Sequence, residues 1–294
     1  MKNEIPEQLC IDGSTYEQQL YDEAIFWLKL ADPNKPSIDE RLREPYYLAT
    51  SFGKDSIVAQ RLCDEAGVQY EAHHNHTTVD PPELVYFGRK YYPDAIRHYP
   101  AKNMFQLIEE KGILPLRKIR FCCEALKEDG GNSRTCVMGI RAAESSRRAK
   151  TWGMMTERHS TNHHLNRIFE PDDIEDFITH CSMKSAVVVS PLFNWLDNVL
   201  WNFIHDRKLP YCELYDQNFS RLGCILCPMA GEKQRRVEKD RWPGYYKLYL
   251  RTAQKLIDSG KMANYGNAEA IMEWWLCEST QRKPIDADQL TLDF

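Results

Sequence analysis

Six consecutive residues near the start of the chain combine the groups that bind phosphate: Ser51, Phe52, Gly53, Lys54, Asp55 and Ser56. Gly53 permits a tight turn and a close approach of phosphate to the backbone, and Lys54 offers a mobile positive charge. The hydroxyls of Ser51 and Ser56 are donors, while Asp55 is suited to cap a helix or to help hold Mg²⁺. The segment therefore predicts a phosphate site, although an ordinary capped turn has a similar composition.

Two close pairs of cysteines form a second candidate site: Cys122 with Cys123, and Cys224 with Cys227. The N-terminus lacks the basic-then-apolar pattern of a secretory signal, so we expect a reducing compartment in which the ten cysteines do not form disulfides. Four thiolates bind either zinc or a [4Fe–4S] cluster, and because adjacent cysteines are less typical of structural zinc, the spacing favours iron and sulfur. Burial in the core is the alternative, which explains one pair better than two. Four further cysteines have apolar or strand-like surroundings and are expected in the core: Cys63, Cys136, Cys181 and Cys212.

The elements around the phosphate segment follow from its flanks. Residues 46–50 are a short β-prone run, and the apolar residues after Ser56 recur at helical spacing, so we expect a strand, a tight turn and a helix. A second strand is predicted over 68–74, followed by a helix that begins near Pro82. Strands over 135–140 and 187–189 complete the pattern. Strands that alternate with helices predict an α/β fold with a doubly wound, mostly parallel, Rossmann-like sheet.

Three regions of the chain are predicted. Residues 1–40 form a helical extension with an amphipathic helix over 15–31, residues 41–228 the nucleotide-binding α/β domain, and residues 229–294 a helical C-terminal region packed on the core. Within the second region, 151–168 is the least regular stretch, and a mobile loop over a site is expected there.

The composition is that of an ordinary globular protein, with 43% hydrophobic and 28% charged residues. No stretch is apolar for long enough to cross a bilayer, so we expect a cytoplasmic protein without a membrane partner. The formal net charge of −5 argues against a protein that coats nucleic acid, but the basic runs over 141–150 and 233–241 are compatible with a local basic groove. The sequence does not indicate the oligomeric state.

Residues 51–56 resemble the PP-loop of the adenine nucleotide alpha hydrolases, whose usual form is Ser-Gly-Gly-x-Asp-Ser. Phe52 replaces the first glycine, as also occurs in the phosphoadenosine phosphosulfate (PAPS) reductase branch. Five further segments are similar to segments of PAPS-reductase-family proteins, in the same order: 77–84, 120–127, 139–145, 191–195 and 222–228. The chain therefore resembles the PAPS reductase family.

This resemblance implies roles for the candidate residues. The loop would bind an adenine nucleotide, either ATP or a sulfonucleotide, and Gly139 and Arg141 would lie across the nucleotide site. Arg141 would face a phosphate or sulfate, for which a guanidinium fork is well suited, whereas an exposed arginine in a surface salt bridge is the simpler alternative. The cysteine arrangement is similar to that of assimilatory adenylylsulfate (APS) reductases, which implies that Cys122, Cys123, Cys224 and Cys227 hold a [4Fe–4S] cluster, with zinc as the alternative.

The resemblance leaves three functions open. An APS or PAPS reductase would use a cysteine nucleophile and a thiol reductant to release sulfite. In the family this cysteine lies within Glu-Cys-Gly followed by Leu or Ile and His, and the segment around Cys277 lacks the glycine and the histidine. An ATP pyrophosphatase would bind ATP and Mg²⁺, with Lys54, Asp55 and Arg141 as catalytic residues, and would adenylate a substrate for sulfur transfer. The retained Lys54-Asp55 pair resembles this second group. Glu144 and Ser145, after Gly139 and Arg141, resemble the enzymes that install sulfur in the DNA backbone, and transfer RNA thiolation is another analogy. These resemblances imply nucleic acid as acceptor and a cysteine desulfurase as a possible sulfur donor. The third is a non-catalytic nucleotide sensor or nucleic-acid-binding protein.

Overall fold

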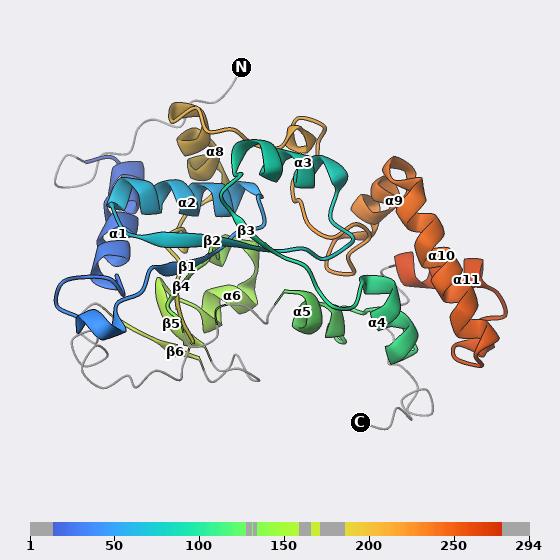
Figure 1. The fold of residues 1–294 in the computed structure, drawn as a ribbon. Helices are drawn as coiled ribbons and strands as arrows, with labels where there is room; N and C mark the ends of the chain where they lie inside the picture. The colour runs from blue at the N-terminus through green and yellow to red at the C-terminus, as the bar shows by residue number, and fades with distance from the viewer. Residues whose placement is uncertain (1–13, 128–130, 132–133, 159–165, 171–185, 278–294) are drawn as a thin grey trace, which may run out of the picture. The chain divides into compact units, whose positions relative to one another are not determined.

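A computed structural model describes residues 14–127, 131, 134–158, 166–170 and 186–277 of the chain (Figure 1). Within these residues the chain divides into two compact units, and each is built from several segments. The first unit contains residues 1–74, 86–98 and 130–213, and the second contains 75–85, 99–129 and 214–294. The region predicted as one nucleotide-binding domain, 41–228, thus contributes to both units.

A seven-stranded sheet runs through the described chain, in the order β3-β2-β1-β4-β7-β5-β6. Its strands are β1 Tyr46–Ala49, β2 Tyr70–Asn75, β3 Ile96–His98, β4 Cys136–Val137, β5 Met155–Arg158, β6 Arg167–Ile168 and β7 Ala186–Val189. The pairs β1–β2, β1–β4 and β4–β7 are parallel, whereas β5 pairs antiparallel with both β6 and β7. The prediction of a mostly parallel α/β sheet is confirmed.

The predicted strand, turn and helix around the phosphate segment are also present. β1 is short and buried through Tyr46, Tyr47 and Leu48, as a central strand covered on both faces should be. Helix α2, Lys54–Ala66, begins directly after the turn and ends at Gly67, whose φ of 71° is a conformation that glycine adopts at little cost. The helix buries a stripe of residues that includes Ile57, Val58, Leu62 and Cys63.

The remaining helices of the described chain are α1 Tyr16–Leu30, α3 Pro82–Tyr91, α4 Met104–Lys111, α5 Phe121–Leu126, α6 Ser146–Thr151, α8 Asp197–Asp206, α9 Glu232–Arg241, α10 Pro243–Asp258 and α11 Ala268–Leu276. Short 3₁₀ turns cover Glu40–Leu42, Ala142–Glu144, Glu213–Tyr215 and Ala263–Tyr265. In the first unit α2 packs on α1 and α8, and Figure 1 shows these three helices on one side of the sheet and α6 on the other. In the second unit Tyr249 of α10 joins two helices, because its ring contacts Phe105 of α4 and Trp275 of α11.

Two expectations for the middle of the chain need correction. The stretch 151–168 is not irregular throughout, because Met155–Arg158 forms β5 and is paired along its whole length with β7. The strand expected over 135–140 is confined to Cys136–Val137, since the chain leaves the sheet to bring Gly139 against the backbone of Asp55. None of the helices that the structure describes is long and apolar enough to span a bilayer.

Candidate active site

The phosphate segment forms a tight turn braced by its own hydroxyls. Ser56 Oγ donates to the carbonyl of Gly53 at 2.9 Å and lies 3.3 Å from the backbone nitrogen of Ser51, which donates to it. The backbone nitrogen of Phe52 donates to Thr50 Oγ1 at 3.2 Å. Gly53 is the N-cap of α2, so Asp55 does not cap the helix but lies in its first turn. The turn therefore presents a helix N-terminus, whose backbone N–H groups favour an anion, at the carboxyl end of β1.

Phe52 adopts a backbone conformation in which glycine is usual. Its φ is 58°, and its ring is 1% exposed between His74 and Tyr92. The absence of a side chain at Gly88 of α3 makes room for this ring, since a Cβ there would lie 2.4 Å from two ring carbons of Phe52. Burial of the ring thus offsets the strain of a left-handed backbone at the position where the usual PP-loop has glycine.

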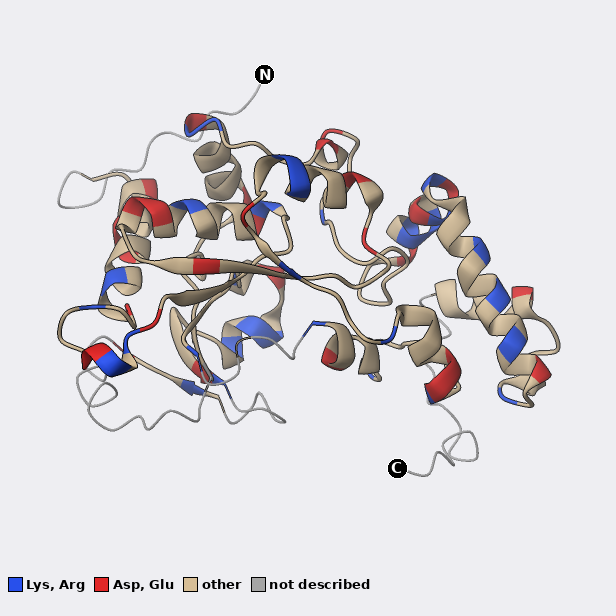
Figure 2. Cartoon of the chain, viewed as in Figure 1, with Lys and Arg blue, Asp and Glu red and all other residues tan. Residues whose placement is uncertain are grey.

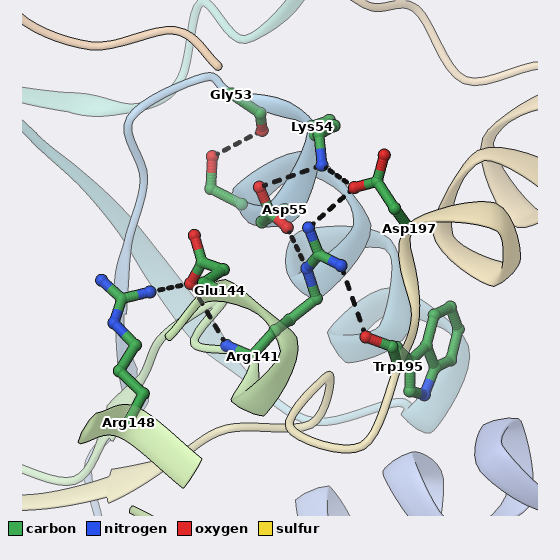
Figure 3. Close-up of polar contacts among 9 residues, drawn as sticks. Gly53, Lys54, Asp55, Arg141, Glu144, Arg148, Trp195 and Asp197 are labelled. Atoms are coloured by element: carbon green, nitrogen blue, oxygen red, sulfur yellow. Dashed lines mark hydrogen bonds and ion pairs between the residues drawn. The ribbon is translucent and has the colours of Figure 1, made fainter. Parts of the chain in front are cut away.

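Two buried cations and two carboxylates meet beside the turn (Figure 3). The Lys54 ammonium and the Arg141 guanidinium, whose side chains are 6% and 5% exposed, both donate to the same oxygen, Asp197 Oδ1. The Arg141 Nη2 to Asp197 Oδ1 distance is 2.9 Å. On its other side, Arg141 donates from Nε to Asp55 Oδ1 at 2.5 Å and from Nη1 to the carbonyl of Trp195 at 3.3 Å.

The network fixes Arg141 more firmly than Lys54. Three nitrogens of the guanidinium have different acceptors, and its backbone nitrogen donates to Glu144, which also pairs with Arg148. Lys54 Nζ, by contrast, is 3.9 Å from Asp55 Oδ2, so Asp197 is its close partner in this group. Burial alone would raise the pKa of the Asp197 carboxyl, but the hydrogen bonds and charges of Lys54 and Arg141 outweigh it, and the pKa is lowered.

Gly139 brings the Arg141 segment against the loop. A Cβ at Gly139 would lie 2.8 Å from the carbonyl carbon and 2.9 Å from the carbonyl oxygen of Asp55. The contact is with backbone, which cannot yield as a flexible side chain can. The structure therefore brings together the predicted residues of the loop with Gly139 and Arg141, all within the first unit.

The four candidate cysteines all belong to the second unit. Cys122 is buried in α5, whereas Cys123 of the same helix, Cys224 and Cys227 are half-buried. A hydrogen bond with Cys123 and then burial raise the pKa of the Cys122 thiol, and the charges of Cys224 and Cys227 raise it further. The charges of the other three cysteines thus act on the Cys122 thiol.

The Cys-x-x-Cys segment forms a turn that is stabilised by three hydrogen bonds. The backbone nitrogen of Cys227 donates to the carbonyl of Cys224 at 3.2 Å, and Leu226 between them has a φ of 60°. The carboxylate of Glu238 accepts from the backbone nitrogen of Leu226 at 2.6 Å, and Cys224 Sγ donates to Thr77 Oγ1 at 3.4 Å. The charge of Cys224 is the largest cause that raises the pKa of Lys127.

As they stand, no three histidine, cysteine, aspartate or glutamate side chains of the described residues are gathered to hold a metal ion. Metal binding by the cysteine quartet therefore stays a prediction. Its donor chemistry fits a thiolate-bound metal group, because four thiols and a nearby ammonium lie in one unit. Of the cysteines expected in the core, Cys63, Cys136 and Cys212 are buried, and Cys181 lies outside the described residues.

Sequence reasoning missed Asp197, the acceptor shared by the two cations. It lies 143 residues from Lys54, so no local spacing connects them. The available signal is its position just after segment 191–195, one of those that resemble the PAPS reductase family. Thr77 and Lys127, which interact with Cys224, lie in the segments 77–84 and 120–127 that resemble the family, but no role was predicted for them.

Comparison with known sequences identifies relatives over most of the chain. Residues 45–230 match the family described as phosphoadenosine phosphosulfate reductase domain. An adenosine 5'-phosphosulfate reductase of Oceanobacillus iheyensis is 33% identical over 214 residues, which cover 68% of this chain and 78% of that protein. Two uncharacterized proteins of Methanocaldococcus jannaschii are 23% and 26% identical, with 80% and 78% of this chain covered. The chain spans about half the length of these two relatives, 47% and 51%.

Solved structures with a similar fold include a PAPS reductase of Candida auris in a phosphate complex, with a TM-score of 0.45, 15% identity and coverage of 74% of this chain and 96% of that one. They also include an FMN adenylyltransferase of Candida glabrata in complex with ATP, with a TM-score of 0.43, 14% identity and coverage of 71% and 61%.

Proposed function

Since the chain belongs to the phosphoadenosine phosphosulfate reductase domain family, we propose that it binds ATP with Mg²⁺ at the loop 51–56 and adenylates an acceptor for sulfur transfer. The observation that carries the proposal is the convergence of two buried cations, Lys54 and Arg141, on one oxygen position beside the N-terminus of α2. β1 lies between β2 and β4, where the strand order reverses, and open α/β sheets bind ligands at this point.

In the proposed reaction an acceptor oxygen attacks the α-phosphorus of ATP, the bond to the bridging oxygen breaks, and pyrophosphate leaves with that electron pair. Lys54 and Arg141 stabilise the charge that develops on the phosphate oxygens, while the backbone N–H groups of the turn bind a further oxygen. Asp55 orients Arg141 through its 2.5 Å hydrogen bond and is the candidate Mg²⁺ ligand. The outer sulfur of a persulfide, carried by a donor such as a cysteine desulfurase, then attacks the activated acceptor and displaces AMP. A thiol reductant cleaves the remaining S–S bond to the donor.

We propose nucleic acid as the acceptor class. α10 carries Lys247, Arg251 and Lys255 at exposed positions four residues apart, visible as repeated blue bands in Figure 2. Lys255 pairs with Glu109 at 2.7 Å, but no partner of Lys247 or Arg251 occurs among the residues that the structure describes. A row of exposed cations at this spacing suits contact with a phosphate backbone, although the whole chain is acidic.

We also propose that Cys122, Cys123, Cys224 and Cys227 hold a [4Fe–4S] cluster, with zinc as the alternative. The support is that all four thiols belong to one unit, that the charges of the other three act on Cys122, and that Cys224 interacts with Lys127, whose positive charge favours thiolates. When bound, such a cluster supplies one-electron redox chemistry or a site for sulfur. Anaerobic purification followed by iron and sulfide counts tests this assignment. A colourless protein with one zinc would exclude the cluster.

The test of the nucleotide proposal is release of pyrophosphate from ATP, measured with and without added DNA or RNA, together with ATP affinity by calorimetry. Lys54→Ala removes a charge-assisted contact and should weaken ATP binding by on the order of tenfold or more. Lys29→Ala, an exposed lysine of α1 in the same unit, is the matched control and should bind as the native chain does. Equal affinity of the Lys54→Ala and Lys29→Ala proteins would contradict the assignment of the loop.

A second candidate function is reduction of a sulfonucleotide, which is favoured by the similarity to the Oceanobacillus iheyensis APS reductase. It predicts sulfite from APS or PAPS in the presence of a thiol. Cys277, the nearest candidate nucleophile to the end of the chain, is the C-cap of α11 and lacks the expected motif around it. ATP binding without either product would instead favour a non-catalytic nucleotide sensor or nucleic-acid-binding protein.

A further inference from the structure

The geometry points to Asp197 as an internal competitor of the nucleotide: its Oδ1 lies where an oxygen of the ligand's phosphate or sulfate would sit. This inference rests on the proposed nucleotide site and adds a residue that sets which anions can enter it. The position of Asp197 Oδ1 is defined by two donors, Arg141 Nη2 at 2.9 Å and the ammonium of Lys54. An anion that accepts from both donors at the point where they converge takes the place of that carboxylate oxygen.

The exposure of the four charged side chains indicates which of them moves. Lys54 and Arg141 are 6% and 5% exposed and Asp55 is 24% exposed, whereas the Asp197 side chain is 60% exposed. Asp197 is therefore the member of the network that can rotate into solvent without displacing its neighbours. After it leaves, two guanidinium nitrogens of Arg141 still donate to Asp55 and to the Trp195 carbonyl, so the group stays oriented.

The two donors that converge on Asp197 are a guanidinium nitrogen and an ammonium, directed at a single oxygen. Both side chains are buried, so water would replace the carboxylate poorly. An anion that replaces Asp197 must therefore be well charged to compete, because it displaces an ionised carboxylate. Asp197 also lies in the first turn of α8, whose N-terminus favours its negative charge. We expect pyrophosphate and triphosphate groups to displace it, and a single phosphate, as in AMP, to do so poorly.

The test compares Asp197→Asn with the native chain, using inorganic pyrophosphate and ATP, each without and with Mg²⁺, and AMP. Removing the competing charge should tighten Mg²⁺-free binding of pyrophosphate by on the order of tenfold and reduce the preference for ATP over AMP. Asp206→Asn, at the other end of α8, is the matched control and should leave every affinity unchanged. Melting temperature provides a second readout. Asp197→Asn should melt lower than the native chain without ligand, because two buried cations lose a charged partner, and pyrophosphate should recover most of that loss.

The other outcomes overturn the inference in different ways. If Asp197→Asn weakens only the Mg²⁺-dependent binding of ATP, Asp197 is a metal ligand and not a competitor. If it weakens all binding and pyrophosphate does not recover the melting temperature, its role is structural. If the native chain and the variant both fail to bind pyrophosphate and ATP, the proposed function fails as well.

Discussion

The packing of Gly88 against Phe52 allows a quantitative test of how the loop is held. Gly88→Ala places a Cβ 2.4 Å from two ring carbons of Phe52, a residue that is 1% exposed and whose ring contacts those of His74 and Tyr92. Because the buried ring cannot move away, the clash should destabilise the protein by about 1–3 kcal/mol. The higher helix propensity of alanine in α3 offsets about 1 kcal/mol of this cost. The net cost in the native background should then be up to about 2 kcal/mol.

The same substitution should change sign when the ring is absent. Phe52→Gly loses buried aromatic packing worth about 3–5 kcal/mol and recovers about 1 kcal/mol, because its φ of 58° suits glycine. In this background the added methyl group of Gly88→Ala meets no ring, and only the gain in helix propensity, about 1 kcal/mol, remains.

Urea unfolding of the native chain, the two single variants and the double variant measures the coupling energy. We expect about 1–3 kcal/mol between positions 52 and 88, equal to the clash itself. If Gly88→Ala destabilises both backgrounds by the same amount, contact with the ring is not the reason for a glycine at this position.

Three further predictions concern other contacts. Gly139→Ala should destabilise the protein by about 1–3 kcal/mol and weaken ATP binding, because the added methyl group clashes with the backbone of Asp55. Gly244→Ala, in the first turn of α10 where nothing lies within 4 Å of the added Cβ, should stabilise the protein by up to about 1 kcal/mol. Urea unfolding measures the stabilities and calorimetry the affinity for ATP. Because the pKa of Asp197 is below its ordinary value of 3.8, its contribution to stability is present above that value and is lost as the pH falls through the lowered pKa, so the gap in melting temperature between native and Asp197→Asn proteins should close in acid. Burial raises the pKa of Glu238 above 4.5, so the stability of the native chain declines as the pH rises through the raised pKa. Glu238→Gln lacks this decline, so its melting temperature relative to the native chain should rise from acid to neutral pH. A difference in melting temperature that stays constant with pH would contradict this reasoning.

The parts of the fold that sequence analysis predicted are those specified by neighbouring residues. The strand over 46–49 is apolar, Gly53 follows it, and the helix over 54–66 has apolar residues at helical spacing. The strand, turn and helix are therefore each determined by residues close together in the sequence. The same holds for the helix that begins at Pro82, where a proline fits the first turn.

The parts that escaped prediction depend on residues far apart in the chain. β5 is a strand because β7 pairs with it, and its four residues do not show the alternation of a half-buried strand. Arg141 was expected to face an anion, but nothing in its surroundings in the sequence indicated that Asp55 and Asp197 would be its partners. Such long-range pairs become visible only once the sheet has brought the segments together.

The chain passes between its two compact units five times, at 74–75, 85–86, 98–99, 129–130 and 213–214. Neither unit can therefore be excised as one continuous piece, and a fragment that ends at residue 213 would keep the loop and Cys122 but lose Cys224 and Cys227. The two candidate cysteine pairs are thus separated in the sequence by a long segment of the first unit. A genetic exchange with its boundary in that segment would separate one pair from the other while leaving the loop in place.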